Sequence, residues 1–459
     1  MNYDDFLLNK RYILNASGFD IEADKLNKNL LDYQKAIVKW SLKKGKCALF
    51  EDTGLGKTIQ QLVWADEVVK HTNGKVLILA PLAVSKQTKN EGIKFNIELN
   101  LCERQEDVKN GINITNYEKI HKFDTNCFDG VVLDESSILK SYNGATTRDL
   151  IDRFKNTLYK LCCTATPSPN DFTEIGNHSE FLGIMTRSEM LSMFFINDVS
   201  HGDGWRLKGH SEKEFYKWIA EWGMLINNPS NLGFDGDMFN LPKLNIITHI
   251  IGSEKSENSL FVEYARTLQE RREARKDSLE ARVNKANEIV QNLDNCLVWC
   301  DFNNESELLS KTINGSVEVK GSDKPEHKET SMINFANGNL KILVSKPSIC
   351  GFGMNWQNCN NMIFCGLSDS YEQFYQAIRR CWRFGQTKEV NVYVIISEKE
   401  MNVLENIRKK EDNHKRMTEE MINIMSDILK CEIKNTTRKN TEYIPKEEIM
   451  LPKFLLGVD

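Results

Sequence analysis

Short apolar runs alternate with longer amphipathic stretches in two separate parts of the chain. The first part contains the runs KVLILAP, GINITNY, GVVLDE and LYKLCCTATP, between residues 75 and 167. The second part contains CLVWCDF, GSVEVKGS, LKILVSK, NMIFCG and VNVYVII, between residues 296 and 396. Such short runs are typical of parallel strands that are buried on both faces. Two successive alternations of strand and helix therefore predict two α/β units.

The stretches around these units differ from them in composition. Residues 172–241 are rich in aromatic residues, asparagine and glycine, and residues 261–293 form a highly charged run. We interpret Arg271, Arg272 and Arg275 in that run as part of a solvated helix face. The pattern predicts a first unit, an insertion, a helical linker, a second unit and a C-terminal helical brace, with the boundaries 1–172, 173–245, 246–294, 295–398 and 399–459.

The overall composition is that of a soluble globular protein, with 40% hydrophobic and 27% charged residues. The chain has no apolar stretch near the ~20 residues that span a bilayer and no signal-peptide pattern at its start, so we expect a cytoplasmic protein of a bacterium or a phage-infected host, with no membrane partner. The twelve cysteines include no C-x-x-C pair, which favours reduced thiols over a zinc site. Because the net charge is -5, any basic track for a nucleic acid must be local.

A glycine-rich segment, EDTGLGKT (residues 51–58), lies between the apolar run CALF and a helical stretch. A turn from strand to helix presents backbone N–H groups and the positive end of the helix to phosphate oxygens. Lys57 then reaches the β and γ phosphates, and the Thr58 hydroxyl ligates Mg²⁺. Glu51 stands where the strict pattern has glycine. The segment predicts a site for ATP and Mg²⁺, with the backbone contacts made by Thr53, Gly54, Leu55 and Gly56.

Two further segments supply charged groups for ATP hydrolysis. The run GVVLDE ends in Asp134, which we expect to hold the magnesium, and Glu135, which we expect to orient or deprotonate the attacking water. In the second unit, residues 376–386 (QAIRRCWRFGQ) contain Arg380 and Arg383, three positions apart, so a helix places both on one face. Guanidinium groups that face a γ phosphate stabilise the charge of the transition state.

Together these segments resemble the superfamily 2 helicases, most closely the Swi/Snf-type DNA translocases. The similarity covers residues 29–396 and lies in a series of motifs in the family's order: LDYQ (31–34), LILAPL (77–82), ITNYE (114–118), DESSILK (134–140), TATP (164–167), GS (321–322), SKP (345–347), CGFGMN (350–355) and the RFGQ that ends at residue 386. The resemblance implies two RecA-like lobes that clamp one ATP between them.

The resemblance also implies individual roles. Gln34 corresponds to the glutamine that reads adenine, and Gly353 lies in an ATP-sensing motif. Thr164, Ala165 and Thr166 form the motif that couples hydrolysis to lobe movement. The residues expected to contact the nucleic acid, from the family motifs or from the need for a local basic track, are Pro81, Lys86, Thr115, Tyr117, Ser345, Lys346 and Gly351.

The chain departs from the family pattern at several positions. Ser137 stands where the family usually has histidine, and Gln87 stands where it often has tryptophan. Arg379 and Trp382 replace the residues usually found beside the finger arginines. The catalytic ligands are intact, so we expect hydrolysis to be preserved. Ser137 changes the position at which the family bridges the ATP site to the coupling motif.

The sequence therefore predicts an ATP-dependent DNA helicase or translocase, with duplex DNA as its track. A helicase that separates strands of DNA or RNA is the nearest alternative. An ATP-switched regulator that holds a partner protein is another, although such a switch needs no finger arginines. Partners in replication, repair or restriction are compatible with the sequence, and the heavy use of Asn and Lys suits a compact phage or bacterial protein.

Overall fold

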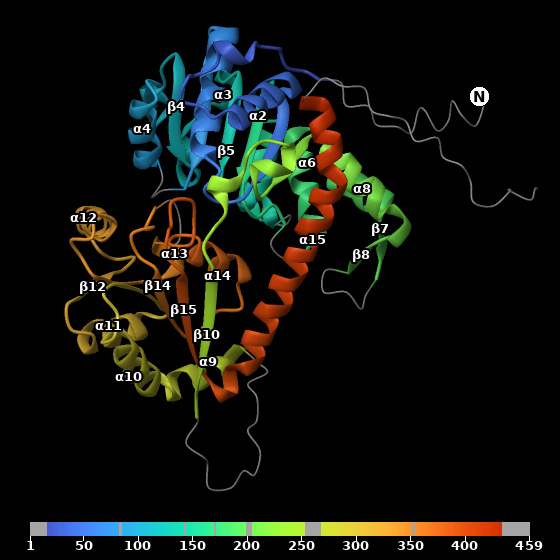
Figure 1. Ribbon diagram of the computed structural model, residues 1–459. Helices are drawn as coiled ribbons and strands as arrows, with labels where there is room; N and C mark the ends of the chain where they lie inside the picture. The colour runs from blue at the N-terminus through green and yellow to red at the C-terminus, as the bar shows by residue number, and fades with distance from the viewer. Residues whose placement is uncertain are drawn as a thin grey trace, which may run out of the picture.

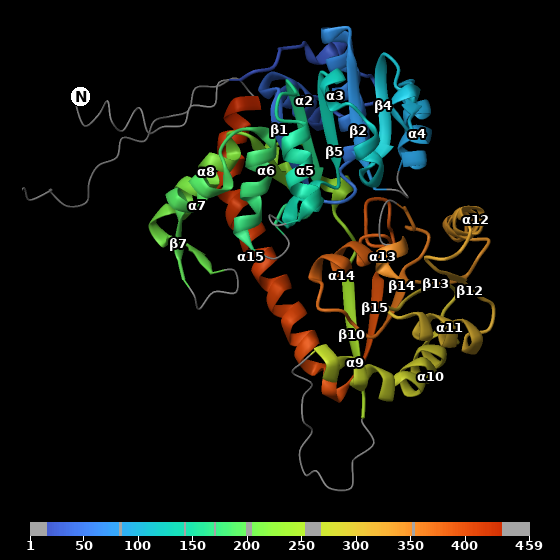
Figure 2. The same ribbon diagram turned by 180° about the vertical axis from the view of Figure 1, so that it is seen from behind.

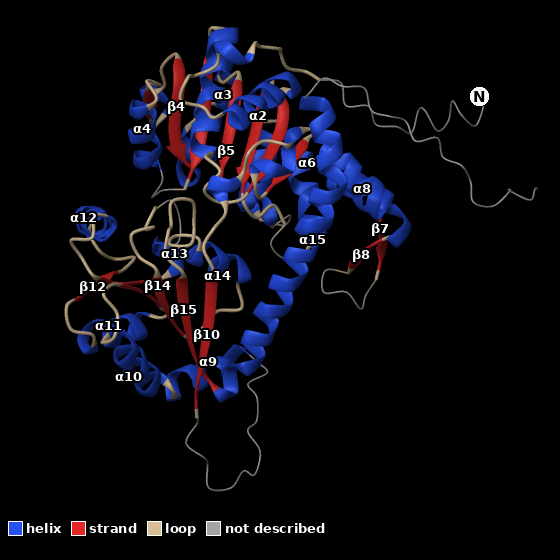
Figure 3. Ribbon diagram, in the orientation of Figure 1, coloured by secondary structure: helices blue, strands red, loops and turns tan. Residues whose placement is uncertain are grey.

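The computed structural model describes residues 16–81, 85–141, 144–168, 171–198, 204–252, 268–350 and 354–433. These residues form two α/β lobes, which lie one above the other in Figure 1. Figure 3 shows each lobe as a layer of strands with helices packed around it. The predicted α/β fold with two lobes is confirmed.

The sheet of the first lobe is built from seven parallel strands. Their spatial order is β3 (Leu99–Leu101), β4 (Gly111–Asn116), β2 (Lys75–Ala80), β5 (Gly130–Asp134), β6 (Tyr159–Thr164), β1 (Lys46–Glu51) and β9 (Gly223–Ile226). The central strands are almost fully buried, which explains their continuous apolar sequences. Every strand that the apolar runs of this lobe predict is present.

Helices surround this sheet and extend from it on one side. They are α2 (Asp32–Lys44), α3 (Lys57–Thr72), α4 (Ser85–Lys94), α5 (Ala145–Arg153), α6 (Ile175–Leu182), α7 (Arg187–Phe194) and α8 (Glu212–Ala220). A small antiparallel hairpin of β7 (Phe195–Asn197) and β8 (Trp205–Leu207) follows α7. Figure 2 shows α7, α8 and the hairpin standing away from the sheet, as an insertion into the lobe.

The second lobe has a six-stranded parallel sheet. The strand order is β10 (Leu244–Ile251), β15 (Val390–Ser397), β14 (Asn361–Cys365), β11 (Cys296–Trp299), β13 (Ile342–Ser345) and β12 (Ser316–Val319). The helices of this lobe are α9 (Leu268–Asp277), α10 (Leu279–Val290), α11 (Asn303–Thr312), α12 (Pro325–Ala336), α13 (Pro347–Cys350) and α14 (Tyr371–Ile378). All the strands predicted for the second unit are observed.

The long helix α15 (Met401–Ile433) connects the two lobes along one side (Figure 1). Its first turns bury Val403, Leu404 and Ile407 in the core of the second lobe. Its last turns bury Met421 and Leu429 in the core of the first lobe. The described part of the predicted C-terminal brace therefore packs against both lobes, and residues 434–459 lie outside the described residues.

Two strands lie outside the predicted boundaries. β9 lies in the segment predicted as an insertion and adds a strand to the first sheet. β10 begins just before residues 246–294, predicted as a helical linker, and forms the edge of the second sheet. The sequence of β10, LNIITHII, leaves Ile246 and Ile250 partly exposed, as an edge strand can. It lacks the continuous burial that marks the central strands, so the apolar pattern did not identify it.

The interpretation of Arg275 as a solvated residue is wrong. Its guanidinium is buried and lies 2.9 Å from the Glu305 carboxylate and 2.8 Å from the Asp301 carboxylate. Arg275 donates to both carboxylate oxygens of Glu305, and Arg282, which is fully buried, donates to the Oε1 atom of Glu305 at 3.0 Å. A buried charge must be paired, and the partners of Arg275 lie 26 and 30 positions later in the chain. The side chains of Arg271 and Arg272 lie outside the described residues.

The twelve cysteines all lie in the described part of the chain, most of them are buried, and none of them forms a disulfide there. Among the described helices, none combines the length and the apolar character that a membrane crossing requires.

Candidate nucleotide site and nucleic-acid interface

The glycine-rich segment forms the predicted turn between β1 and α3. Gly54 and Gly56 have φ angles of 95° and 83°, a left-handed conformation that glycine adopts without strain. The turn leads directly into α3, so the positive end of that helix faces the loop. The Lys57 ammonium folds back over the turn and donates to the carbonyl oxygens of Glu51 at 2.6 Å and Asp52 at 3.0 Å. The loop thus surrounds one positive charge with backbone groups, as a phosphate cradle requires.

Gln34 and Tyr33, at the start of α2, attach that helix to the loop. The Tyr33 hydroxyl donates to the Leu55 carbonyl at 2.6 Å, and the Gln34 amide donates to the same oxygen at 3.0 Å. Gln34 is buried, and its amide oxygen accepts from the backbone N–H of Leu31. The predicted adenine reader therefore lies beside the phosphate loop, where a base attached to bound phosphates can be reached.

Two buried carboxyl groups lie at the carboxyl edge of the first sheet. β6 separates β5 from β1, and Cys163 of β6 pairs with both Asp134 and Leu49. Burial and the charge of Glu135 raise the pKa of Asp134 to about 7, against the opposing hydrogen bond of Gln61. Burial also raises the pKa of Glu51 to about 7, although Lys57 lowers it. The edge is therefore a poorly solvated region in which negative charge is costly without a cation.

Glu135 is one of the few non-glycine residues with a positive φ, 54°. This left-handed conformation turns the chain sharply at the end of β5 and begins a short 3₁₀ helix, Ser136–Lys140. A non-glycine residue in this region is typical of functional sites. One carboxylate oxygen of Glu135 is buried and has no hydrogen-bond partner among the described residues. An acceptor placed in this way is free to bind and orient a water.

One residue beside Asp134 and Glu135, which together form the acidic pair of the site, was not predicted from the sequence. His178, from α6, lies fully buried with its Nε2 atom 3.1 Å from the Ser136 hydroxyl. Burial lowers the pKa of His178 to about 4, so the imidazole is neutral. The adjacent Asn177 donates to the Leu139 carbonyl at 2.6 Å. α6 therefore supports the 3₁₀ helix that follows Glu135, and the 42-residue separation gives no local signal by which the sequence could reveal it.

The predicted coupling motif, Thr164 to Thr166, begins at the end of β6, between the strands that carry the loop and the acidic pair. The Thr164 hydroxyl accepts a hydrogen bond from the backbone N–H of Thr166 at 3.1 Å, which closes a tight turn around Ala165. The Thr166 hydroxyl is buried and has no hydrogen-bond partner among the described residues. The motif thus lies next to both the phosphate loop and the carboxyl groups at the end of β5.

The second lobe contributes Arg380 and Arg383. The prediction that both lie on a helix is wrong, because α14 ends at Ile378 and the two arginines lie on the turn that follows. Their guanidinium groups nevertheless converge and donate to one carbonyl oxygen, that of Met354, at 3.2 and 3.3 Å. Burial and the charge of Arg383 lower the pKa of Arg380 to about 10, against the attraction of Glu135. Glu135 belongs to the first lobe, so one of the charges that act on Arg380 comes from the opposite lobe.

Other contacts hold the lobes together at this point. Phe384 lies against the phosphate loop, and a β carbon added to Gly54 would be only 2.9 Å from the Phe384 β carbon. Lys140, at the end of the 3₁₀ helix, forms an ion pair with Glu372 of α14. The two lobes thus meet where the predicted catalytic residues gather, between α14 and the lower edge of the upper lobe in Figure 1.

The donor groups at this edge fit ATP and Mg²⁺. Among the described residues, no group of three His, Cys, Asp or Glu side chains could hold a metal ion. Magnesium does not need one, because it usually keeps several waters and binds one or two protein oxygens together with substrate phosphates. The Thr58 hydroxyl and the Asp134 carboxylate are such oxygens. Buried polar atoms of Thr53, Glu135 and Arg383 without partners lie on the loops around them, as expected where a polar ligand completes the hydrogen bonding.

Several of the residues predicted to contact the nucleic acid are not exposed at the surface. Thr115, Tyr117 and Ser345 are buried. The Tyr117 hydroxyl donates to the Asp134 carbonyl at 2.7 Å, and the Ser345 hydroxyl donates to the Val319 carbonyl at 2.8 Å. The hydroxyls of Tyr117 and Ser345 are thus engaged within their lobes, which corrects the expectation that they grip phosphates, whereas the buried Thr115 hydroxyl has no hydrogen-bond partner among the described residues.

Two of the remaining predicted contacts are near the surface. Pro81 is partly exposed at the end of β2, and the Lys346 ammonium is exposed and donates to Asn303 at 2.6 Å. Gly351, Gly353 and the side chain of Lys86 lie outside the described residues. Lys346 is therefore the described cation that best fits the predicted track.

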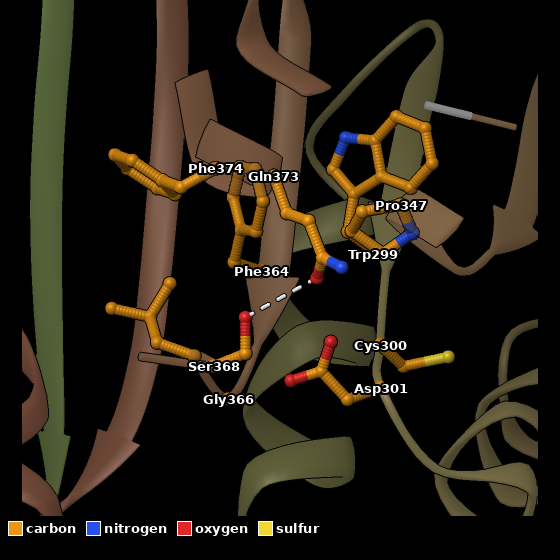
Figure 4. A pocket seen from close by; sticks show the side chains of 10 residues that line it. Trp299, Cys300, Asp301, Pro347, Phe364, Gly366, Ser368, Gln373 and Phe374 are labelled. Atoms are coloured by element: carbon orange, nitrogen blue, oxygen red, sulfur yellow. Dashed lines mark hydrogen bonds between the residues drawn. The ribbon is translucent and has the colours of Figure 1, made fainter. Parts of the chain in front are cut away.

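The carboxyl edge of the second sheet contains a small cavity, shown in Figure 4. Its volume is about 10 Å³, and Trp299, Phe364 and Phe374 fill most of the space around it. A volume of this size holds at most one water. This cavity therefore has no room for a nucleotide.

Models of two protein families match the chain, one in each lobe. Residues 33–194 match the SNF2-related domain, and residues 281–385 match the helicase conserved C-terminal domain. The chain is a superfamily 2 helicase of the Swi/Snf type. It is accordingly an ATP-hydrolysing enzyme.

Curated relatives of this Swi/Snf-type helicase differ greatly in length. The uncharacterized ATP-dependent helicase YqhH of Bacillus subtilis is 22% identical over 470 residues, which cover 88% of this chain and 80% of the relative. Helicase domino of Drosophila melanogaster is 33% identical over 107 residues, which cover 23% of this chain and 3% of that protein. Among solved structures, the Sulfolobus solfataricus SWI2/SNF2 ATPase core in complex with dsDNA aligns with 90% of this chain and 97% of its own, at 17% identity and a TM-score of 0.42.

Proposed function

We infer that this helicase hydrolyses ATP between its lobes and uses the cycle to move along duplex DNA. The observation that carries the proposal is the position of the arginine turn. Phe384, the residue after Arg383, lies against the phosphate loop of the first lobe, and a β carbon added to Gly54 would be 2.9 Å from the Phe384 β carbon. The predicted finger arginines therefore come from the second lobe, whereas Glu135, the predicted water-orienting carboxylate, comes from the first. Hydrolysis then requires the lobes to be closed, and any change in their separation is tied to the state of the nucleotide.

Each group has a chemical role in this proposal. The loop N–H groups and Lys57 bind the phosphates, and Glu135 orients the attacking water and accepts its proton. Arg380 and Arg383 stabilise the negative charge that develops on the transferred phosphoryl oxygens. Mg²⁺, when bound by Thr58 and Asp134, neutralises charge between the phosphates. The tight turn at Thr164 to Thr166 adjoins the strands of both the loop and the acidic pair, which supports its role in coupling.

Duplex DNA is the proposed track because the match to the SNF2-related domain agrees with the sequence resemblance to the Swi/Snf-type translocases. A track of this kind grips phosphates and reads no bases. An enzyme that separates the strands of DNA or RNA uses the same ATP site, so the nucleic acid must be identified by experiment.

The test is ATP turnover measured without nucleic acid and with duplex DNA, single-stranded DNA or RNA. We expect duplex DNA to raise kcat the most. Stimulation by RNA alone would replace the proposed track, and turnover that is indifferent to every nucleic acid would favour an ATP-switched regulator.

A further inference from the structure

Two of the positions at which the chain departs from the family pattern, Arg379 and Trp382, are in contact with each other. The Arg379 guanidinium lies over the Trp382 ring, 4.4 Å from its centroid, and 5.1 Å from the centroid of Tyr375. The Trp382 indole N–H donates to the Pro242 carbonyl at 2.7 Å, which fixes the ring. The proposed function uses neither side chain, although both adjoin the finger arginines.

The partner of Arg379 is Asp52, the second residue of the phosphate-loop segment in the other lobe. The two side chains form an ion pair, and both are largely buried, with exposed side-chain fractions of 7% for Arg379 and 16% for Asp52. The Tyr375 hydroxyl donates to the other oxygen of Asp52 at 2.7 Å. The same oxygen accepts from the backbone N–H of Thr53 at 2.7 Å. The pair is therefore continuous with the backbone of the loop itself.

The side chains around this ion pair border an open space between the lobes. Asp52, Tyr375, Arg379 and Trp382 all line a cavity of about 190 Å³ that lies between the lobes and α15. Side chains at the border of a cavity lose part of their dispersion contacts. A largely buried ion pair, in contrast, strongly resists separation, because separating its members leaves a charge poorly solvated and unpaired. The relative position of the loop and the arginine turn thus depends strongly on this pair.

We propose that Asp52, Tyr375 and Arg379 form an interlobe latch that sets the position of the finger arginines relative to the phosphate loop, with Trp382 as its support. Arg379 immediately precedes Arg380, and Asp52 supplies one of the carbonyl oxygens that hold Lys57. A displacement of Arg379 therefore moves the adjacent finger Arg380, and a displacement of Asp52 moves the carbonyl oxygen that holds Lys57. The latch residues position the catalytic groups and contact no reacting atom.

This inference rests on the proposed ATP hydrolysis between the lobes, and a double-mutant cycle tests it. The four proteins are the wild type, Asp52→Asn, Arg379→Gln and the double variant, each assayed for kcat and KM with ATP and saturating duplex DNA. Each single substitution leaves the opposite group unpaired, so we expect kcat to fall about tenfold to hundredfold with little change in KM. The double variant removes both charges, so its kcat should be no lower than that of the worse single variant.

Effects on kcat that multiply in the double variant would show that the two residues act independently, and would overturn the latch. A change in KM alone would also overturn it, because Asp52 would then serve only to bind ATP. A matched control is the exposed pair Glu214 and Lys217 on α8, 2.7 Å apart, whose neutral variants should keep the wild-type kcat. An inactive wild type would instead refute the proposed function.

Tyr375→Phe provides a second test that does not depend on removing a charge. It deletes only the hydroxyl that donates to Asp52 and keeps the ring beneath the guanidinium, so the fold should be unaffected. We expect a fall in kcat of about threefold to tenfold. An unchanged kcat would contradict the latch even if the charge variants failed to fold.

Discussion

The two lobes have the same parallel architecture, but their carboxyl edges differ. In the first lobe this edge carries a glycine turn, a lysine and a pair of carboxyl groups, and several buried polar atoms there have no protein partner. In the second lobe, aromatic side chains such as Trp299 and Phe364 line a cavity of only about 10 Å³ at this edge. The comparison teaches that the fold alone does not make a nucleotide site. The loops of one lobe form the site, and the other lobe completes it with two arginines.

Removing the phosphate-binding and water-orienting groups of the first lobe should have the largest effect. Lys57→Ala should abolish hydrolysis, because it removes the positive charge inside the phosphate loop. Glu135→Gln should still bind ATP and turn it over very slowly, because only the water-orienting carboxylate is lost. ATP binding and turnover, measured on both variants, check these outcomes. Turnover of Glu135→Gln at the wild-type rate would show that this carboxylate has another role.

The second lobe should matter almost as much, through its arginines alone. Arg380→Ala or Arg383→Ala should lower kcat by about 10³ to 10⁵ with little effect on the fold, as loss of a finger does in related chemistry. Single-turnover rates, with circular dichroism as a control for folding, measure this effect. A fully active double variant would mean that the shared contact with the Met354 carbonyl is their entire function.

A smaller effect should reveal the poorly solvated edge of the first lobe. The pKa values of Glu51 and Asp134 are raised to about 7 from 4.5 and 3.8, so the folded chain retains two protons that the unfolded chain loses. This contribution to stability is complete below the unfolded values and is lost as the pH rises through 7. In the absence of Mg²⁺ and ATP, Tm should fall between pH 5 and pH 8.

Glu51→Gln isolates the share of one group. The glutamine side chain at position 51 is neutral at every pH, so the Tm of the variant should fall less than that of the wild type between pH 5 and pH 8, by an amount on the order of 5 °C. Thermal unfolding at a series of pH values measures the difference. Glu214→Gln, an exposed acid on α8, is the matched control and should keep the wild-type slope. Equal slopes for Glu51→Gln and the wild type would place the pH dependence elsewhere.

The smallest expected effect concerns the track. Lys346→Ala should reduce the slope of log affinity for duplex DNA against log salt by about one unit, while leaving DNA-free ATPase activity nearly unchanged. Lys217→Ala, which removes an exposed lysine from α8, is the control. Parallel lines for Lys346→Ala and the wild type would mean that DNA does not bind at this end of the second lobe.

Most of the fold, and the phosphate loop of the site, could be predicted from the sequence because they depend on local patterns. Continuous apolar runs identified the central strands, and the spacing of EDTGLGKT identified the phosphate loop. β10 was missed because an edge strand is exposed on one side and lacks such a run. The arginine turn was read as a helix because the spacing of Arg380 and Arg383 suits one, whereas both are held by a carbonyl 26 and 29 positions earlier.

The remaining features depend on residues that are distant in the sequence. Arg275 was read as solvated because its partners, Asp301 and Glu305, follow in another element. Ser345 lies in a motif, but its exposure is decided by the neighbouring strand β12, whose carbonyl accepts its hydroxyl. The pair of Asp52 and Arg379 spans 327 positions. No local pattern contains such contacts, so they could be found only in the folded chain.

The most direct test of the central claim is movement along duplex DNA, measured by displacement of a third strand from a triplex with a long duplex arm on one side. We expect the wild type to displace the third strand only when ATP is supplied, without separating the duplex, and Glu135→Gln to displace none. Unwinding of the duplex, or ATP hydrolysis with no displacement on an arm of any length, would contradict translocation on duplex DNA.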